Sequence, residues 1–346
     1  MWLTFGATAP GVSLLFGWPP EGGGVAPPAA QTSVVSVVIP TRNRPELVPR
    51  AVRSALAQTL AEIEVIVVVD GPDPATRAVL AAIADPRLRV IELDASGGAP
   101  AARNVGAQHA VAEWTALLDD DDEWFPDKLA TQLALGKAAP HALPIVASRL
   151  FMRTPRAELV LPRRLPGPHE PISEYLAVRH GLFHGEGFIQ TSTIMAPTEL
   201  LRRVPFTSGL RRLQELDWTL RCLQLDGVGL VYAPQPLVIW YADENRPRVS
   251  FDSPWRQSFE WLKDSRTRVT PRAYAALAMS VVSSMAAPTR DPRVFAAVLR
   301  EAVRHGRPGA LDYLTFLQVW LVPTGMRRVL RDRVLSRRRV RRLSVG

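Results

Sequence analysis

Four short runs of β-branched and other apolar residues alternate with helical patterns between residues 34 and 118. The predicted strands are Val34–Ile39, Glu64–Val69, Arg89–Leu93 and Trp114–Leu118. The predicted helices between them are Glu46–Gln58, Pro74–Ala84 and Pro100–Val111. Strands that are apolar on both faces and separated by helices indicate a mainly parallel sheet flanked by helices. We therefore expect an α/β fold.

The pattern changes after Pro126, where we expect a helix to begin because proline suits the first helical position. Further strands are predicted at Ile145–Phe151, Ile189–Ala196 and Gly229–Tyr232. From Trp255 onward the sequence looks helical, and the prolines placed to start helices are Pro271, Pro292 and Pro308.

Composition along the chain suggests four parts. Residues 1–32 are rich in Gly, Pro and Ala without periodicity and are expected to form a flexible leader. Residues 33–250 are the predicted α/β domain, residues 251–324 the helical C-terminal region, and residues 325–346 a basic amphipathic tail.

The formal charge of +9 is concentrated in that tail, which holds nine arginines and one aspartate, so the rest of the chain is close to neutral. Apolar residues recur in the tail every three to five positions, as in a basic amphipathic helix that lies on an anionic membrane surface. A solvated or disordered tail is the alternative. Nucleic acid is not expected as a partner, because no aromatic residues alternate with the arginines.

One cysteine, Cys222, cannot build an internal disulfide framework and fits a reducing compartment. The first 20 residues lack the basic start of a secretory signal, and no apolar run reaches the roughly 18 residues that span a membrane. We expect a cytoplasmic protein, either soluble or peripheral on the cytoplasmic face of the membrane.

Polar residues gather where the predicted strands end. They are Pro40, Thr41, Asn43, Asp70, Arg103 and Asp119–Asp122. In a parallel sheet of this kind, ligands bind beyond the carboxyl ends of the strands. We therefore expect these residues to line one site.

The run Asp119–Asp122 is the most informative of these features. Four carboxylates directly after a buried strand repel one another unless a cation neutralises them, and Mg²⁺-type ions prefer oxygen ligands. Residues two apart on a strand point to the same side, which suits an Asp-x-Asp metal site. A solvated acidic turn is the alternative, but the preceding apolar strand favours the metal.

Asp70 and Arg103 are weaker signals taken singly. Asp70 suits hydrogen bonds from a nucleobase or ribose, although Asp-Gly is also an ordinary turn sequence. Arg103 follows Gly97-Gly98 at the start of a predicted helix, where a guanidinium suits a diphosphate. An ordinary surface arginine is the alternative.

The order of these motifs resembles family 2 glycosyltransferases of the GT-A fold, over roughly residues 33–250. The matching segments are Val-Ser-Val-Val-Ile-Pro-Thr-Arg-Asn at 35–43, Val-Val-Asp-Gly at 68–71 and Leu-Leu-Asp-Asp-Asp-Asp-Glu-Trp-Phe-Pro-Asp-Lys-Leu at 117–129. Val69 stands where the family usually has the first Asp of Asp-Asp-Gly-Ser.

The resemblance implies a role for each residue of the first half. Asp70 contacts the base of the nucleotide, and Pro40, Thr41 and Asn43 line its pocket. Asp119 and Asp121 are the Asp-x-Asp pair. The metal, Mn²⁺ or Mg²⁺, is assigned to Asp121 and Asp122, and the nucleotide sugar to Arg103, Asp119 and Asp120.

The resemblance extends to two later segments. Gly187–Met195 resembles the family's Thr-Ser-Thr strand beneath the acceptor, which implies Thr191 and Ser192 as acceptor-side residues. Leu213–Arg221 resembles the segment that supplies the catalytic base. Gln214 and Glu215 replace the usual Glu-Asp there, so Glu215 is the preferred base and Asp217 the supporting carboxylate, with the assignment open between the two.

These features together imply an inverting glycosyltransferase that moves a sugar from a nucleoside-diphosphate sugar to a hydroxyl of a glycan or lipid-linked glycan. A sugar-nucleotide nucleotidyltransferase is the first alternative, although it would need a Gly-rich loop after the first strand. A phosphoryl-transfer aspartate site is disfavoured because Glu123 stands where Thr or Val is needed. The third alternative is a catalytically silent module that binds nucleotide sugars.

Overall fold

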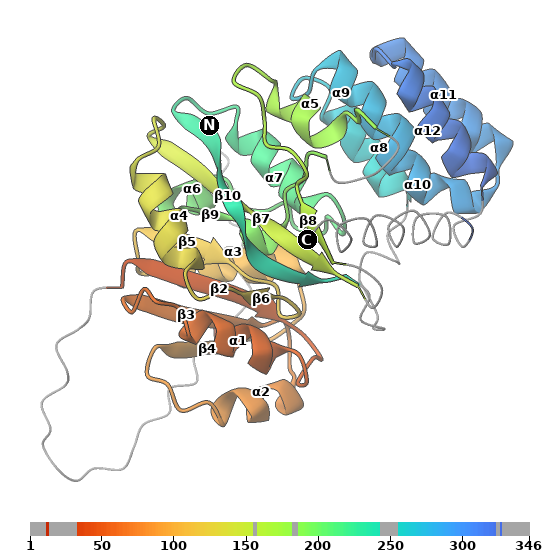
Figure 1. Ribbon diagram of the computed structural model, residues 1–346. Helices are drawn as coiled ribbons and strands as arrows, with labels where there is room; N and C mark the ends of the chain where they lie inside the picture. Colours follow the sequence, from red (N-terminus) through yellow and green to blue (C-terminus); the bar gives the residue numbers. More distant parts are fainter. Residues whose placement is uncertain are drawn as a thin grey trace, which may run out of the picture. The chain divides into compact units, whose positions relative to one another are not determined.

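The computed structural model describes residues 12–13, 33–154, 158–181, 186–242, 255–322 and 326 (Figure 1). These residues form two compact units. The first is drawn from Met1–Ala134 and Met195–Gly209, and the second from Leu135–Ile194 and Leu210–Gly346. This grouping does not test the domain boundaries expected at residues 32, 250 and 324, which stay predictions.

The first unit is built on a mainly parallel sheet, as the apolar runs predicted. Its strands are β2 (Val35–Thr41), β3 (Ile63–Val69), β4 (Leu88–Leu93), β5 (Trp114–Leu117) and β9 (Met195–Pro197), in the order β4-β3-β2-β5-β9. The pairs β4–β3, β3–β2 and β2–β5 are parallel, and β5–β9 is antiparallel. The short strand β1 (Val12–Ser13) adds to β4 in antiparallel fashion.

Helices cover this sheet, and every residue of β2 and β3 is buried. They are α1 (Val48–Leu56), α2 (Pro74–Ala81), α3 (Ala99–His109), α4 (Lys128–Lys137) and α6 (Thr198–Arg203). Proline stands in the first turn of α1, α2 and α3, where its missing N–H costs no helical hydrogen bond. The Asp73 side chain caps α2 by accepting from the Thr76 N–H.

Helix α3 packs closely on the central strand β2 because Gly106 has no side chain there. A Cβ atom at Gly106 would lie 2.3 Å from Cγ1 of Val38. We expect Gly106→Ala to lower the free energy of unfolding by about 2 kcal/mol, since overpacking of a core usually costs that much. Urea unfolding measures the change. Gln108→Ala, on the exposed face of the same helix, should leave stability nearly unchanged. Equal stability of the two variants would contradict this packing.

The second unit contains a long pair of parallel strands, β7 (Leu143–Arg153) and β10 (Val228–Tyr241), with irregular register around Pro236. The short strand β8 (Glu158–Leu161) pairs with β7 in antiparallel fashion. Strand β10 is much longer than the predicted Gly229–Tyr232, since pairing with β7 continues past Pro236 to Tyr241.

The strand predicted at Ile189–Ala196 is wrong over most of its length. Residues Thr191–Thr193 form a short 3-10 helix, η1, and only Met195 and Ala196 belong to a strand, β9. The Gln190 side chain accepts the Ser192 N–H at 2.8 Å, and the Thr193 hydroxyl donates to the Gln190 carbonyl at 2.6 Å. Such local hydrogen bonds compete with a β ladder and favour a turn.

Helices make up the rest of the second unit, and those after Trp255 confirm the predicted helical region. They are α5 (Ile172–Ala177), α7 (Gln214–Cys222), α8 (Trp255–Asp264), α9 (Pro271–Ala276), the π-helical η3 (Leu277–Val282), α10 (Ser283–Ala286), η4 (Ala287–Thr289), α11 (Pro292–His305) and α12 (Ala310–Leu321). Helices α8 to α12 pack together (Figure 1). They share one apolar core that includes Leu262, Met279 and Phe316. Among the described residues, no helix has the length and apolar character needed to cross a bilayer.

Candidate active site

The first strand end, after β2, is held by short hydrogen bonds. Thr41 is 3% exposed, and its hydroxyl donates to Oδ2 of Asp120 at 2.8 Å. Asn43 has a φ of +53°, a left-handed conformation that asparagine tolerates better than most residues. Its N–H donates to Oδ2 of Asp73 at 2.6 Å. Pro40, Thr41 and Asn43 therefore lie on a sharply turned, fixed segment at the carboxyl edge of the sheet.

Asp70, the residue after β3, anchors the loop that leads into α3. Its carboxylate accepts hydrogen bonds from the Ser96 hydroxyl at 2.6 Å, the Gly97 N–H at 2.8 Å and the Gly98 N–H at 3.0 Å. The side chain is buried, and its own N–H donates to the Thr41 carbonyl at 2.9 Å. Asp70 thus joins the ends of β2 and β3 to the glycines before α3.

Arg103 is a buried residue of α3, so the alternative of an ordinary surface arginine is wrong. It is 4% exposed, and its guanidinium lies 5.5 Å from the ring centre of Phe206. Its Nη2 donates to Oδ1 of Asp119 at 2.6 Å. The structure therefore places Arg103 against the first residue of the acidic run.

The four aspartates after β5 divide into two sets. Asp119, Asp121 and Asp122 each offer a carboxylate oxygen, and these oxygens lie within 4.8 Å of one another. Asp120 instead accepts from Thr41 and from Nη1 of Arg44, the latter at 2.7 Å. Burial, reinforced by the charge of Asp121, raises the pKa of Asp120 to about 6, although Arg44 opposes this shift.

Two arginines that the sequence analysis missed hold this run. Arg44 lies 3.2 Å from Oδ2 of Asp121 in addition to its bond with Asp120. Arg50, in α1, donates to the backbone carbonyl of Asp121 at 2.7 Å. Both arginines follow the turn after β2, which is the feature of the sequence that could have identified them. The chain contains many other arginines, so this position did not distinguish them.

The cluster of Asp119, Asp121 and Asp122 fits a divalent metal by its chemistry. Three carboxylates are hard oxygen donors, which Mg²⁺ and Mn²⁺ prefer over nitrogen or sulfur. The cluster includes Asp121 and Asp122, the residues predicted as ligands, and adds Asp119. Asp120 does not belong to it, because its carboxylate is directed at Thr41 and Arg44.

The segment after the aspartates is fixed by Lys128, the first residue of α4. Lys128 is fully buried, and its amine lies 3.7 Å from the ring centre of Trp124. Burial lowers the pKa of this amine well below its usual value. The Trp-x-Pro-x-Lys-Leu pattern thus places an amine on an indole face within the core.

Glu215 lies in the first turn of α7, in the second unit, and is partly exposed. The hydroxyl of Thr191 donates to Oε1 of Glu215. Thr191 and its neighbour Ser192 are both fully buried. The structure therefore brings together the predicted base and one predicted acceptor-side residue, while Ser192 bonds with Gln190 instead.

Asp217, two residues further along α7, differs from Glu215 in burial. It is 2% exposed and accepts from Nε of Arg221 and Nε1 of Trp261, each at 2.9 Å. Nη1 of Arg268 lies 3.4 Å from the same carboxylate. Asp217 thus ties α7 to α8 and to the segment after it, and is a structural anchor.

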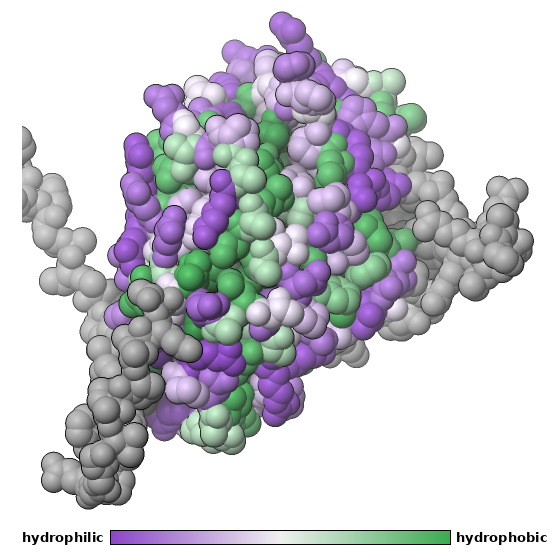
Figure 2. Space-filling model, turned by 60° about the vertical axis from the view of Figure 1, so that its left-hand side comes forward, coloured by the Kyte–Doolittle hydropathy of each residue, from purple (hydrophilic) through white to green (hydrophobic). Residues whose placement is uncertain are grey.

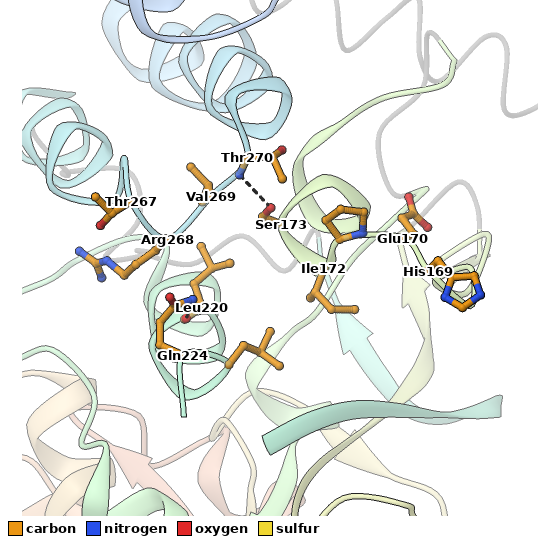
Figure 3. A pocket seen from close by; sticks show the side chains of 12 residues that line it. His169, Glu170, Ile172, Ser173, Leu220, Gln224, Thr267, Arg268, Val269 and Thr270 are labelled. Carbon is orange, nitrogen blue, oxygen red and sulfur yellow. Dashed lines mark hydrogen bonds between the residues drawn. The ribbon is translucent and has the colours of Figure 1, made fainter. Parts of the chain in front are cut away.

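A pocket of about 630 Å³ lies beside α7 in the second unit. Its lining comes from residues 169–173, from Leu220 of α7, from Leu223 and Gln224 just after that helix, and from residues 267–270 (Figure 3). The Thr270 N–H donates to the Ser173 hydroxyl at 3.3 Å across it. Arg268 belongs both to this lining and to the contacts of Asp217.

Comparison with known proteins identifies the domain. Residues 36–193 match the family model described as glycosyl transferase family 2. This match covers β2 to η1, including the aspartate cluster and Thr191. Residues 36–193 therefore correspond to a glycosyl transferase family 2 domain.

Several curated relatives are named as glycosyltransferases or as polysaccharide biosynthesis proteins. The chain is 43% identical over 105 residues to the succinoglycan biosynthesis protein ExoO of Rhizobium meliloti, covering 30% of each chain. It is 27% identical over 251 residues to the amylovoran biosynthesis glycosyltransferase AmsB of Erwinia amylovora, covering 68% of this chain and 79% of AmsB. A third relative, WfgD of Escherichia coli, is named a UDP-Glc:alpha-D-GlcNAc-diphosphoundecaprenol beta-1,3-glucosyltransferase; it is 30% identical over 102 residues, 30% of this chain and 40% of WfgD. The chain thus spans less than half the length of ExoO and WfgD.

Solved structures confirm the GT-A fold. The mannosyltransferase PcManGT from Pyrobaculum calidifontis, in complex with GDP-Man and Mn²⁺, aligns with a TM-score of 0.52 at 18% identity over 88% of this chain and 86% of PcManGT. S. aureus TarS 1–349 in complex with UDP-GlcNAc aligns with a TM-score of 0.51 at 16% identity over 83% of this chain and 79% of TarS. At these identities the likeness concerns the fold alone.

Proposed function

We propose that the protein transfers a sugar, with inversion, from a nucleoside-diphosphate sugar to a hydroxyl of a glycan or lipid-linked glycan. The observation that carries this proposal is the cluster of Asp119, Asp121 and Asp122 directly after β5, within a family 2 domain. The names of the relatives support an acceptor in polysaccharide synthesis.

The nucleotide is assigned to the carboxyl edge of β2 and β3. Pro40, Thr41 and Asn43 line its pocket, and Asp70 accepts a hydrogen bond from the base. A carboxylate offers about four acceptor positions. Asp70 uses three of them on residues 96–98, so one remains for a nucleobase while the loop stays fixed.

The divalent metal, Mn²⁺ or Mg²⁺, is assigned to Asp121 and Asp122, with Asp119 beside them. When bound, such an ion neutralises negative charge on the leaving diphosphate. The protein's own part is to keep the carboxylates in position. Arg103 holds Asp119 at 2.6 Å, and Arg44 and Arg50 hold Asp121 by its side chain and its backbone. Such fixed ligands need no rearrangement when the ion arrives.

The base is assigned to Glu215. Its carboxylate accepts the proton of the acceptor hydroxyl while that oxygen bonds to the anomeric carbon and the bond to the diphosphate breaks. Attack from the face opposite the leaving group inverts the configuration. Partial exposure of Glu215 leaves room for an acceptor, and the Thr191 hydroxyl fixes its orientation. Asp217 is already bound by Arg221 and Trp261, so its role is to position α7.

A screen of nucleotides by thermal shift tests the donor assignment. With Mn²⁺ present, we expect one nucleoside diphosphate and its sugar conjugate to raise the Tm by a few degrees. A ligand that binds one site and is present at about 100 times its Kd produces a shift of this size. Nucleoside triphosphates and sugar 1-phosphates belong in the same screen. Stabilisation by these alone would favour a nucleotidyltransferase, and no stabilisation by any nucleotide would contradict the proposal.

The cytoplasmic, membrane-peripheral location is also a proposal. The Arg-rich segment predicted to bind membrane lies outside the described residues, apart from Met326. Sedimentation with anionic vesicles, before and after deletion of residues 325–346, tests this segment. Equal binding by both forms would refute its role.

A further inference from the structure

The outer face of α12 carries almost no polar group. Its exposed residues are Ala310, Tyr313, Leu314, Leu317, Gln318 and Leu321. Leu314 is 57% exposed and Leu321 72%. The one charged residue of this helix, Asp312, is buried and bound to Arg272. A helix that faces water normally carries charged residues on its outer side.

The inner face of α12 packs against α11 in the core of the second unit. Phe316 is 1% exposed, and its ring centre lies 4.7 Å from that of Phe295 in α11. Trp320 lies 5.3 Å from the same Phe295 ring. The exposed leucines of α12 therefore do not belong to this core.

Helix α11, which packs beside α12, exposes cations. Its exposed side holds Arg293, Arg300 and Arg304 together with Val303, and Arg307 follows the helix. Its single acid, Glu301, is only partly exposed and binds Arg266 and the Tyr274 hydroxyl. Within the described residues, the exposed positions of α11 and α12 thus combine apolar side chains with positive charge and carry no acid. We call these positions the α11–α12 surface.

We propose that the α11–α12 surface docks on an anionic lipid bilayer. Leucine side chains of α12 enter the boundary between headgroups and acyl chains, and arginines of α11 contact lipid phosphates. A helix of this kind binds through its buried apolar area together with attraction to anionic lipid. Continuity along the chain supports this, because nine further arginines lie within the residues that follow position 325. This inference does not rest on the proposed sugar transfer.

Charge disfavours two other partners for the α11–α12 surface, namely a second copy of the chain and the chain's own C-terminal tail. A symmetric dimer through this surface would place the same arginines of two chains near each other, since a two-fold interface repeats one patch on both sides. The tail of the chain, with nine arginines and one aspartate, would meet a surface of its own sign. The positive charge of the exposed arginines therefore favours an anionic partner for this surface. Figure 2 shows one face of the molecule, on which apolar and hydrophilic residues are mixed.

Flotation of the full chain with vesicles tests this proposal without any activity measurement. Vesicles of phosphatidylglycerol and phosphatidylethanolamine are compared with phosphatidylcholine vesicles. We expect the double variant Leu314→Glu/Leu317→Glu to lower partitioning into the anionic vesicles more than about tenfold, because both side chains lose apolar burial and gain repulsion. Val111→Glu is the matched control, since Val111 is 72% exposed and lies outside α11 and α12. It should partition like the unchanged protein.

Two further measurements distinguish an anionic bilayer from a second copy of the chain as the partner of this surface. Arg300→Glu/Arg304→Glu should weaken binding to anionic vesicles and leave binding to phosphatidylcholine unchanged. Unchanged melting curves show that the exposed substitutions leave the fold intact. Partitioning of Leu314→Glu/Leu317→Glu into anionic vesicles as strong as that of the unchanged protein would overturn the proposal. A dimer seen by light scattering and lost in that variant would assign the surface to a second copy of the chain instead.

Discussion

Asp121→Asn is expected to abolish the Mn²⁺-dependent part of nucleotide binding. Asp121 shares a carboxylate cluster with Asp119 and Asp122, and an amide gives up both the charge and one donor oxygen of that cluster. Loss of a ligand or its support commonly costs tenfold to hundredfold in metal affinity, so we expect a drop of about hundredfold. Calorimetric titration of the nucleoside diphosphate, with and without Mn²⁺, measures it.

The neighbouring Asp120 supplies a matched control for this experiment. Its carboxylate faces Thr41 and Arg44 and lies outside the cluster. Asp120→Asn should therefore keep the tightening of nucleotide binding by Mn²⁺. Equal loss of the Mn²⁺ effect in both variants would contradict the division of the four aspartates. Undiminished Mn²⁺ dependence in Asp121→Asn would remove Asp121 from the metal site.

Glu215→Gln is expected to remove sugar transfer while leaving nucleotide affinity and the fold intact. The amide keeps the shape of the side chain and its contact with Thr191 but cannot take a proton from an acceptor. General-base catalysis contributes about 10²–10⁴-fold to a rate, and kcat should fall by that factor. Steady-state kinetics with the donor found in the thermal-shift screen provide the measurement.

Asp217→Asn is the companion variant and should behave differently. It breaks a buried network with Arg221, Trp261 and Arg268, so we expect the free energy of unfolding to fall by about 3 kcal/mol. The remaining folded enzyme should keep a substantial kcat. Wild-type turnover by Glu215→Gln, together with a fully folded but inactive Asp217→Asn, would transfer the role of base to Asp217.

The sequence predicted the first unit well because its signals are local. Strands β2 to β5 begin and end within two residues of the predicted limits, since each is a short apolar run between polar turns. The helices between them are likewise marked by proline at the start. The Thr191–Thr193 turn was mispredicted because two local hydrogen bonds, both accepted by Gln190 from Ser192 and Thr193, outweigh the β-branched character of the segment.

The site was predictable in its residue types and less so in its geometry. The aspartate run was recognisable, but only the fold shows that Asp120 faces Thr41, a residue 79 positions earlier in the chain. The anchoring of Asp217 by Trp261 joins residues 44 positions apart. Arg44 and Arg50 carry no distinctive motif in so arginine-rich a chain. Such long-range pairs depend on packing, which no local pattern encodes.

The configuration of the released sugar tests the central claim most directly. Incubation with Mn²⁺ and an α-linked donor, such as UDP-glucose or GDP-mannose, permits slow transfer to water when no acceptor is present. Proton NMR identifies the first anomer before it equilibrates. The mechanism predicts the β anomer first, and no release by Asp121→Asn or Glu215→Gln. Release of the α anomer first would contradict direct inverting displacement by a carboxylate base.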